Sequence, residues 1–482
     1  MAVLAPPTDL TRLSATELAR WIRRRELSAL DVVDAHIEIL ERWDPKLNVL
    51  VHKRFEAARR EAEEVDALIA EAPDPEALPP LFGVPCTCKE SIAVAGMPNC
   101  AGVVARREHR AAKTAPAARR LLEAGAILLG LTNTSELTLW VETENRVYGR
   151  TCNPYDPERT AGGSSGGEAA AIACGGAPIG LGTDFGGSIR LPAFFNGIFG
   201  HKPSAGLVPN AGHYPPALDE ADRIVATGPL ARRAEDLMPV LRVLAGDGHG
   251  QARGESRLGD PSEVSLEGLR VVLAERTALG PISRELNAAR EQAAGALAAA
   301  GARLERVSLR KMRRALELYL TVLYKQVDTT LEELLGEAGA ERLGLSHLLR
   351  RGGPHTVATR LTVLAERAGR LVPEWRWRQV LSARAAFVEE LRETIGDGVL
   401  LHTSAPKVAP LHGGTVGRLW WIHPMVGFNL AGLPVTQVPL GLNEEGMPLG
   451  VQVAGGPGRD HVSIAVGREL ERVFGGWVPP GS

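Results

Sequence analysis

The sequence has little cysteine and no excess of charge of either sign. Five cysteines in 482 residues cannot form a disulfide scaffold, and no C-x-x-C pair indicates a structural zinc site. Reduced thiols are typical of the cytoplasm, where we therefore expect the protein. The 55 basic and 57 acidic side chains leave a formal net charge of −2, so no overall field attracts nucleic acid.

An uninterrupted apolar run is also missing. The longest uncharged stretch, Leu419–Asn443, contains Pro424, Pro434 and Pro439, which would break a spanning helix repeatedly. The N-terminus lacks the basic-then-apolar pattern of a signal peptide. We predict no transmembrane segment.

Lysine is scarce, with eight lysines among the 55 basic residues. Arginine does not lose its proton in practice, whereas lysine can. Each lysine is therefore a better candidate than usual for a role that needs an amine.

Helical patterns alternate with short apolar strands along the chain. Helices are expected over residues 8–70, 115–125 and 282–300 and over most of 305–395. The run Ala126–Leu131 reads as a strand buried on both faces. Helices that alternate with buried strands predict an α/β fold.

Three segments combine reactive side chains with glycine. They are GVPCTCKES with Lys89, AGGSSGGEAA with Ser164 and Ser165, and GLGTDFGGSIRLPA with Ser188. Ten glycines fall within residues 162–187. Glycine allows the close backbone turns in which several N–H groups converge on one point.

The turn Phe185-Gly186-Gly187-Ser188 could direct such N–H groups toward a developing oxyanion and present the Ser188 hydroxyl as a nucleophile. Two other interpretations stay open from these residues alone. The segment could be an ordinary tight turn, or a cradle for a phosphate.

A serine nucleophile needs a base. His201 follows the third motif and is one candidate, and lysine is the other. An exposed lysine near pH 7 would cost about 4–5 kcal/mol to deprotonate, a penalty that burial can remove. The base must then be a buried lysine at a strand end. Lys89, which follows the uncharged run LFGVPCTC, fits this description, and Lys202 is its rival.

Two other motifs match catalytic patterns less well. Gly162–Gly166 and Gly163–Gly167 both fit G-x-S-x-G, but the preceding CNPYDPERTA is rich in turn residues where that motif needs a strand. Ser308–Lys311 fits S-x-x-K, but it opens a basic helix and has no partner motif. We set both aside.

The three segments together resemble the amidase signature family, and they look closest to its fatty-acid amide hydrolase branch. The C-terminal NLAGLPVTQVPLG also matches. The resemblance covers most of the chain, is densest over 80–215 and is weakest over 300–400. It implies one large domain over 1–482 with a mixed central β-sheet covered by helices on both faces. Within it, 1–75 would form N-terminal helices, 80–215 the catalytic core, and 300–400 a variable helical substrate or cap region.

The resemblance also implies a Ser–cis-Ser–Lys triad. Ser188 would form the acyl-enzyme, Ser164 would relay its proton, and Lys89 would be the base. The implied oxyanion hole consists of the backbone N–H groups of Phe185, Gly186, Gly187 and Ser188. Asp184 and Arg190 would brace the turn, and Ser165 would support its loop. No metal and no cofactor is implied.

The expected reaction is hydrolysis of an amide with a hydrophobic acyl or aryl group. An amidotransferase subunit that releases ammonia from glutamine is the alternative enzyme, and a non-catalytic binding protein is a third hypothesis. Candidate lining residues are Leu139, Trp140, Phe194, Phe195, Trp420, Trp421 and Phe428, although core packing is the favoured interpretation of any one of them.

The stretch 345–364 mixes apolar and basic residues. A basic amphipathic face can serve as a lid, as a dimer contact or as a cap facing a membrane. Peripheral membrane contact and a homodimer, which is common among relatives, are therefore both considered. The acyl length, the leaving amine and the physiological substrate do not follow from the sequence.

Overall fold

The computed structural model describes residues 9–217, 219–246, 258–275, 277, 279–327, 329–339 and 352–481. Within them, eleven strands form one sheet in the order β1-β3-β2-β6-β8-β7-β12-β13-β11-β9-β10, and β4 and β5 form a separate pair. The strands are β1 (Leu50–Lys53), β2 (Pro85–Lys89), β3 (Ile127–Thr132), β4 (Glu144–Asn145), β5 (Gly149–Arg150), β6 (Ile179–Asp184), β7 (Phe199–Lys202), β8 (Ala226–Ala231), β9 (Arg270–Glu275), β10 (Arg303–Ser308), β11 (Val399–His402), β12 (Val435–Leu442) and β13 (Pro448–Gly455).

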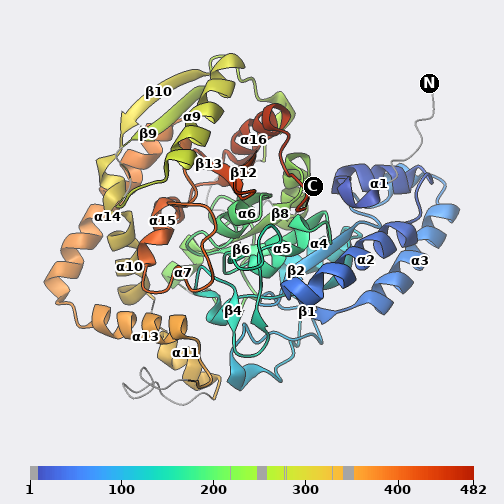
Figure 1. Cartoon of the computed structure of the whole chain (residues 1–482), viewed down its shortest axis with the longest axis horizontal. Helices are drawn as coiled ribbons and strands as arrows, with labels where there is room; N and C mark the ends of the chain where they lie inside the picture. The colour runs from blue at the N-terminus through green and yellow to red at the C-terminus, as the bar shows by residue number, and fades with distance from the viewer. Residues whose placement is uncertain are drawn as a thin grey trace.

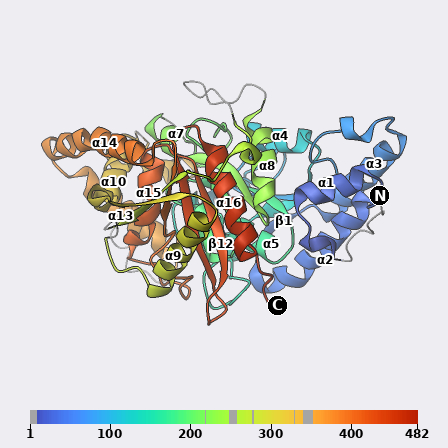
Figure 2. The same cartoon turned by 90° about the horizontal axis from the view of Figure 1, so that it is seen from above.

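Helices flank the sheet (Figures 1 and 2), and the sheet mixes parallel and antiparallel pairs, so the predicted fold class is confirmed. The α-helices are α1 (Ala15–Arg23), α2 (Ala29–Leu47), α3 (Phe55–Glu71), α4 (Pro116–Glu123), α5 (Gly166–Ala173), α6 (Arg190–Phe195), α7 (Asp219–Ile224), α8 (Leu237–Ala245), α9 (Arg284–Ala299), α10 (Ala315–Lys325), α11 (Leu331–Glu337), α13 (Val357–Arg370), α14 (Glu374–Ile395), α15 (His423–Leu430) and α16 (Asp460–Phe474). The blue helices α1–α3 and the orange helices α13 and α14 lie at opposite ends of the molecule in both views.

The N-terminal helices follow the prediction except at one point. Ser14 caps α1 in a reciprocal capping box. Residues 50–53, expected to be helical, form strand β1 at the edge of the sheet instead. The reason lies in Asp44, whose carboxylate accepts the N–H groups of Val49 and Leu50 at 2.9 Å each and turns the chain out of α2.

Three neighbouring parallel strands, β3, β2 and β6, position the candidate site. Cys88 of β2 pairs with Leu181 of β6, so both strands end at the same edge of the sheet. The wholly buried helix α5 packs against them, as its apolar composition predicts. Gly180 leaves the room that the Glu168 carboxylate occupies, because a Cβ at this position would collide with Glu168 Oε1.

The 300–400 region is mainly helical, although β10 extends the sheet before the helices begin. Of the stretch 345–364, residues 345–351 lie outside the described part of the chain, and α13 begins at Val357. In the portion that the structure covers, no helix has both the length and the apolar character needed to cross a bilayer. The same portion contains no group of three or more His, Cys, Asp or Glu side chains able to hold a metal ion.

Candidate active site

Lys89 is the last residue of β2, and its side chain is completely buried. Its Nζ lies 2.6 Å from Ser164 Oγ and 2.9 Å from Thr183 Oγ1. The sequence predicts a buried lysine at a strand end, and the geometry agrees.

Burial lowers the pKa of Lys89 to about 7, while the negative fields of Asp184 and Glu168 act in the opposite direction. An amine with this pKa is roughly half neutral near pH 7. The penalty for deprotonating an ordinary lysine is therefore largely removed before any substrate binds.

Ser164 lies in the turn that leads into α5. Its side chain is 1% exposed, and the peptide bond that joins it to Gly163 is cis. No strand directly precedes this turn, which agrees with setting aside the G-x-S-x-G pattern. Ser165 Oγ donates to the Thr183 carbonyl at 3.3 Å, so this second serine ties the turn to β6.

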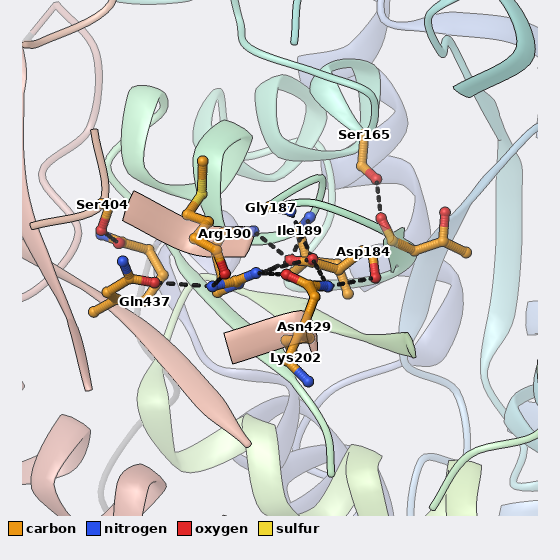
Figure 3. A network of polar contacts seen from close by, with 12 residues as sticks. Ser165, Asp184, Gly187, Ile189, Arg190, Lys202, Ser404, Asn429 and Gln437 are labelled. Atoms are coloured by element: carbon orange, nitrogen blue, oxygen red, sulfur yellow. Dashed lines mark hydrogen bonds and ion pairs between the residues drawn. The ribbon is translucent and has the colours of Figure 1, made fainter. Parts of the chain in front are cut away.

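Ser188 lies between the end of β6 and the start of α6. Asp184 braces this turn from inside, because its carboxylate accepts the N–H groups of Gly187 at 2.7 Å and Ile189 at 3.2 Å. Figure 3 shows Asp184 between the turn, Arg190 and Asn429. Arg190, fully buried, makes a two-pronged ion pair with this carboxylate at 2.9 and 3.0 Å. The Arg190 guanidinium holds the pKa of the Asp184 carboxyl well below its usual range despite the burial.

The bracing changes the predicted oxyanion hole. Of the four expected donors, Gly187 already gives its N–H to Asp184. Within the described residues, the N–H groups of Phe185, Gly186 and Ser188 have no protein acceptor. Gly187 instead shapes the turn, with φ +114° and with Met425 Sδ in the space that a Cβ would need. Three of the four expected donors therefore have no acceptor among the described residues, and the fourth is engaged by Asp184.

The turn that carries Ser164 is tied to the turn that carries Ser188 through the backbone of the neighbouring Ser165. Ser165 N donates to the Ser188 carbonyl at 3.3 Å. In the described part of the chain, no hydrogen bond joins the side chains of Ser164 and Ser188. The structure thus brings Lys89 and Ser164 into direct contact, and it shows no hydrogen bond of the Ser188 hydroxyl to any residue that it describes.

The competing bases have other partners. His201 is buried, with Nδ1 2.9 Å from Thr436 Oγ1 and Nε2 3.1 Å from Asp460 Oδ1. Lys202 donates to the Pro203 carbonyl at 2.8 Å. In the S-x-x-K motif, Lys311 forms a surface ion pair with Glu390 at 3.2 Å, and neither Ser308 nor Lys311 lines the two cavities described below.

Two cavities meet at these residues. The larger has about 710 Å³ of empty space with its open mouth included, and Ser164 and Thr183 contribute to its wall. The smaller has about 500 Å³, and Gly186 and Ser188 contribute to its wall. Both are mainly apolar, and they share Thr138, Leu139, Phe185, Leu323 and Tyr324.

The lining residues differ from most of those predicted. Leu139 lines both cavities and Trp140 lines the smaller one. The other candidates line neither cavity and pack in or against the hydrophobic core, which is the favoured interpretation of each from the sequence; they are Phe194, Phe195, Trp420, Trp421 and Phe428. Phe194, Phe195 and Phe428 belong to α6 and α15, which are buried on every side, and the two tryptophans lie in the 3-10 turn Leu419–Ile422 that precedes α15. Helix α10 and the segment 215–217 supply much of the wall instead.

Sequence reasoning misses Thr183 and His213. Thr183 Oγ1 lies 3.2 Å from His213 Nε2 as well as 2.9 Å from Lys89 Nζ. The place of Thr183 five residues before Ser188 is a signal that could have found it. No sequence pattern singles out His213.

Comparison with known proteins agrees with this arrangement. The Amidase family model matches residues 31–463. Fatty-acid amide hydrolase 2 of Homo sapiens is 39% identical over 495 residues, which cover 99% of this chain and 92% of that protein. A glutamyl-tRNA(Gln) amidotransferase subunit of Nitratidesulfovibrio vulgaris (strain DP4) is 32% identical over 491 residues, which cover 96% of this chain and 97% of that protein. The structure of 6-aminohexanoate cyclic dimer hydrolase complexed with substrate matches with a TM-score of 0.82 and 25% identity, over 98% of this chain and 99% of that one.

By class, then, the protein is an amide hydrolase with an α/β fold. The chain belongs to the amidase signature family and is similar to the fatty-acid amide hydrolases within it.

Proposed function

We propose that Ser188 attacks the amide carbonyl while its proton passes through Ser164 to neutral Lys89. The observation that carries this proposal is the 2.6 Å contact between Lys89 Nζ and Ser164 Oγ at the end of a buried strand. Protonated Lys89 then returns the proton by the same route to the leaving nitrogen, which departs as an amine. Water, deprotonated along the same path, hydrolyses the acyl-enzyme and restores Ser188.

The relay requires the Ser188 hydroxyl to turn toward Ser164 when substrate binds. Catalytic hydrogen bonds are often long in a free enzyme and tighten in the complex. The free N–H groups of Phe185, Gly186 and Ser188 would hold the oxyanion, and loss of one such donor typically costs about 3 kcal/mol of transition-state stabilisation. Neither metal nor cofactor enters these steps.

The substrate is an amide with a hydrophobic acyl or aryl group. The apolar walls of both cavities support this class, since an apolar group placed there is removed from water. Because Ser164 lines one cavity and Ser188 lines the other, one would take the acyl group and the other the leaving amine. The name of the human relative, fatty-acid amide hydrolase 2, supports the same class.

A panel assay tests this proposal. Substrates are p-nitroanilides of rising acyl length, primary fatty amides and glutamine, and the variants are Ser188→Ala and Ser164→Ala with Ser165→Ala as the matched control. We expect the first two to lose nearly all turnover and the control to keep most of it. Near-normal activity of Ser188→Ala would refute the nucleophile. Labelling by a fluorophosphonate probe, expected only with Ser188 intact, separates an enzyme from a non-catalytic binding protein.

The amidotransferase alternative has less support, because the identity is 32% to the amidotransferase relative and 39% to the hydrolase. Glutaminase activity that depended on a copurifying partner would favour it. All five cysteines are free thiols, which supports the predicted cytoplasmic location.

Membrane contact and homodimer formation stay predictions. The corner between α13 and α14 exposes Leu371 and Trp375 beside Arg376, a pattern compatible with either contact. Sedimentation with anionic vesicles and light scattering, each repeated with Trp375→Ser, distinguish the two.

A further inference from the structure

Besides its contact with Ser164, the Lys89 amine contacts a second chain of hydrogen-bonded groups. Lys89 Nζ lies 2.9 Å from Thr183 Oγ1, and Thr183 Oγ1 lies 3.2 Å from His213 Nε2. On the far side of the ring, His213 Nδ1 lies 2.8 Å from the Pro215 carbonyl oxygen. Four groups thus follow one another from a backbone carbonyl to the amine.

The direction of each hydrogen bond follows from the two ends of the His213 ring. A carbonyl oxygen can only accept, so His213 Nδ1 must carry a proton. Burial lowers the pKa of His213 to about 3, so the ring is neutral and its Nε2 has no proton. Nε2 is then an acceptor, and among the described residues its partner is Thr183. The Thr183 hydroxyl must therefore donate to His213.

This direction decides what Thr183 can offer to Lys89. Its only proton points to His213, so it presents lone pairs to the amine and accepts one of its N–H groups. A neutral amine with an N–H held in this way can aim its lone pair at the Ser164 hydroxyl. Without His213, the Thr183 hydroxyl would be free to donate to that lone pair and to compete with Ser164 for it.

The backbone around His213 is fixed to the segment that follows Lys89. Ala93 N donates to the Gly212 carbonyl at 2.9 Å, and Tyr214 N donates to the Ser91 carbonyl at 2.8 Å. The imidazole is thus held beside the segment that continues from Lys89, at the wall of the larger cavity.

We propose that His213 is a positioning residue for the amidase reaction, which acts by accepting the Thr183 hydroxyl proton and so orients the Lys89 amine toward Ser164. The inference rests on the proposed function, because it requires Lys89 to be the base. His213 exchanges no proton with substrate in this scheme.

Four variants test the inference with one p-nitroanilide substrate. His213→Leu removes the acceptor, His213→Gln offers a side-chain oxygen in place of Nε2, Thr183→Val removes the hydroxyl at nearly constant shape, and the fourth combines His213→Leu with Thr183→Val. We expect His213→Leu to lower kcat roughly 10- to 100-fold, the range typical when a partner that orients a reactive group is lost, with a much smaller effect on KM. His213→Gln should restore most of kcat.

The double variant is the decisive member of the set. If His213 acts through Thr183, the double variant should be no slower than Thr183→Val alone. Three outcomes would overturn the inference. The first is a double variant whose loss of kcat is the product of the two single losses. The others are a change confined to KM, or a His213→Gln variant as slow as His213→Leu. Ser188→Ala in the same assay distinguishes failure of this inference from failure of the proposed function. If Ser188→Ala stays active, the proposed function itself is wrong. Circular dichroism and thermal melting show which variants fold. If His213→Leu does not fold, His213→Gln still tests the inference.

Discussion

The ends of β2 and β7 carry two lysines that are buried alike and differ in what they face. Burial lowers the pKa of both Lys89 and Lys202 to about 7. Lys89 faces two hydroxyl groups that line the larger cavity, whereas Lys202 faces the Pro203 carbonyl and lines neither cavity. A carbonyl has no proton to give. Burial therefore provides a neutral amine, and a hydroxyl within reach makes that amine useful as a base.

The largest difference is expected when each lysine is replaced by methionine, which keeps the length and removes the amine. Lys89→Met should lower kcat at least about 10³-fold, because neither base nor acid remains. Lys202→Met should keep at least about a tenth of the activity, since its amine touches no reacting group. Steady-state kinetics on a p-nitroanilide, with circular dichroism as the folding check, measure both. A folded Lys202→Met protein as inactive as Lys89→Met would remove the distinction.

Asp184 connects the two lysines, because burial lowers the pKa of both and the negative charge of Asp184 partly opposes that lowering in each case. Asp184→Asn leaves the buried Arg190 without a counter-charge, which should cost about 3 kcal/mol of unfolding free energy. With the negative charge gone, the pKa of Lys89 should fall further, and the acid limb of the rate profile should move to lower pH. Denaturant titration and a pH–rate profile measure the two effects. Asp236 is another buried carboxylate and serves as the control. Asp236→Asn should destabilise the protein and leave the acid limb of the pH–rate profile in place.

The sequence identifies both lysines as candidates, but it does not show which groups each amine contacts in the folded protein. Lys89 and Lys202 both follow apolar stretches, so both are candidates from residue patterns alone. The family resemblance favours Lys89, and the three-dimensional contacts show what each amine faces. The α/β pattern is readable because Ala126–Leu131 and α5 are apolar on every side. Strand β1 cannot be predicted in this way, because the turn before it depends on one side chain, the Asp44 carboxylate. His213 leaves no signal, since its place depends on how residues 212–214 pair with 91–93, far away in the chain.

The pH dependence of turnover follows from the Lys89 amine. A base must be unprotonated, and the pKa of Lys89 is about 7, so kcat should fall about tenfold for each pH unit below that value and level off above it. A pH–rate profile from about pH 5 to 9 measures the limb. Lys202→Met is the control, and its limb should coincide with that of the parent protein. A limb that moved with Lys202→Met would mean that the second lysine is coupled to the chemistry.

Lys202 should instead affect how the unfolding free energy depends on pH. Its pKa is about 7 in the folded protein and about 10.4 in an unfolded chain, so between these values the unfolded state binds more protons. Unfolding free energy then rises with pH across this window, by up to about 1.4 kcal/mol per pH unit for one lysine. Lys202→Met removes this contribution, so its stability should gain on the parent as pH falls from about 9 to 7. Other groups titrate equally in both proteins and cancel in the difference. If the difference in unfolding free energy between the two proteins did not change with pH, Lys202 would be charged in the folded protein. The lysines at the ends of β2 and β7 would then differ in their ionisation as well as in their hydrogen-bond partners.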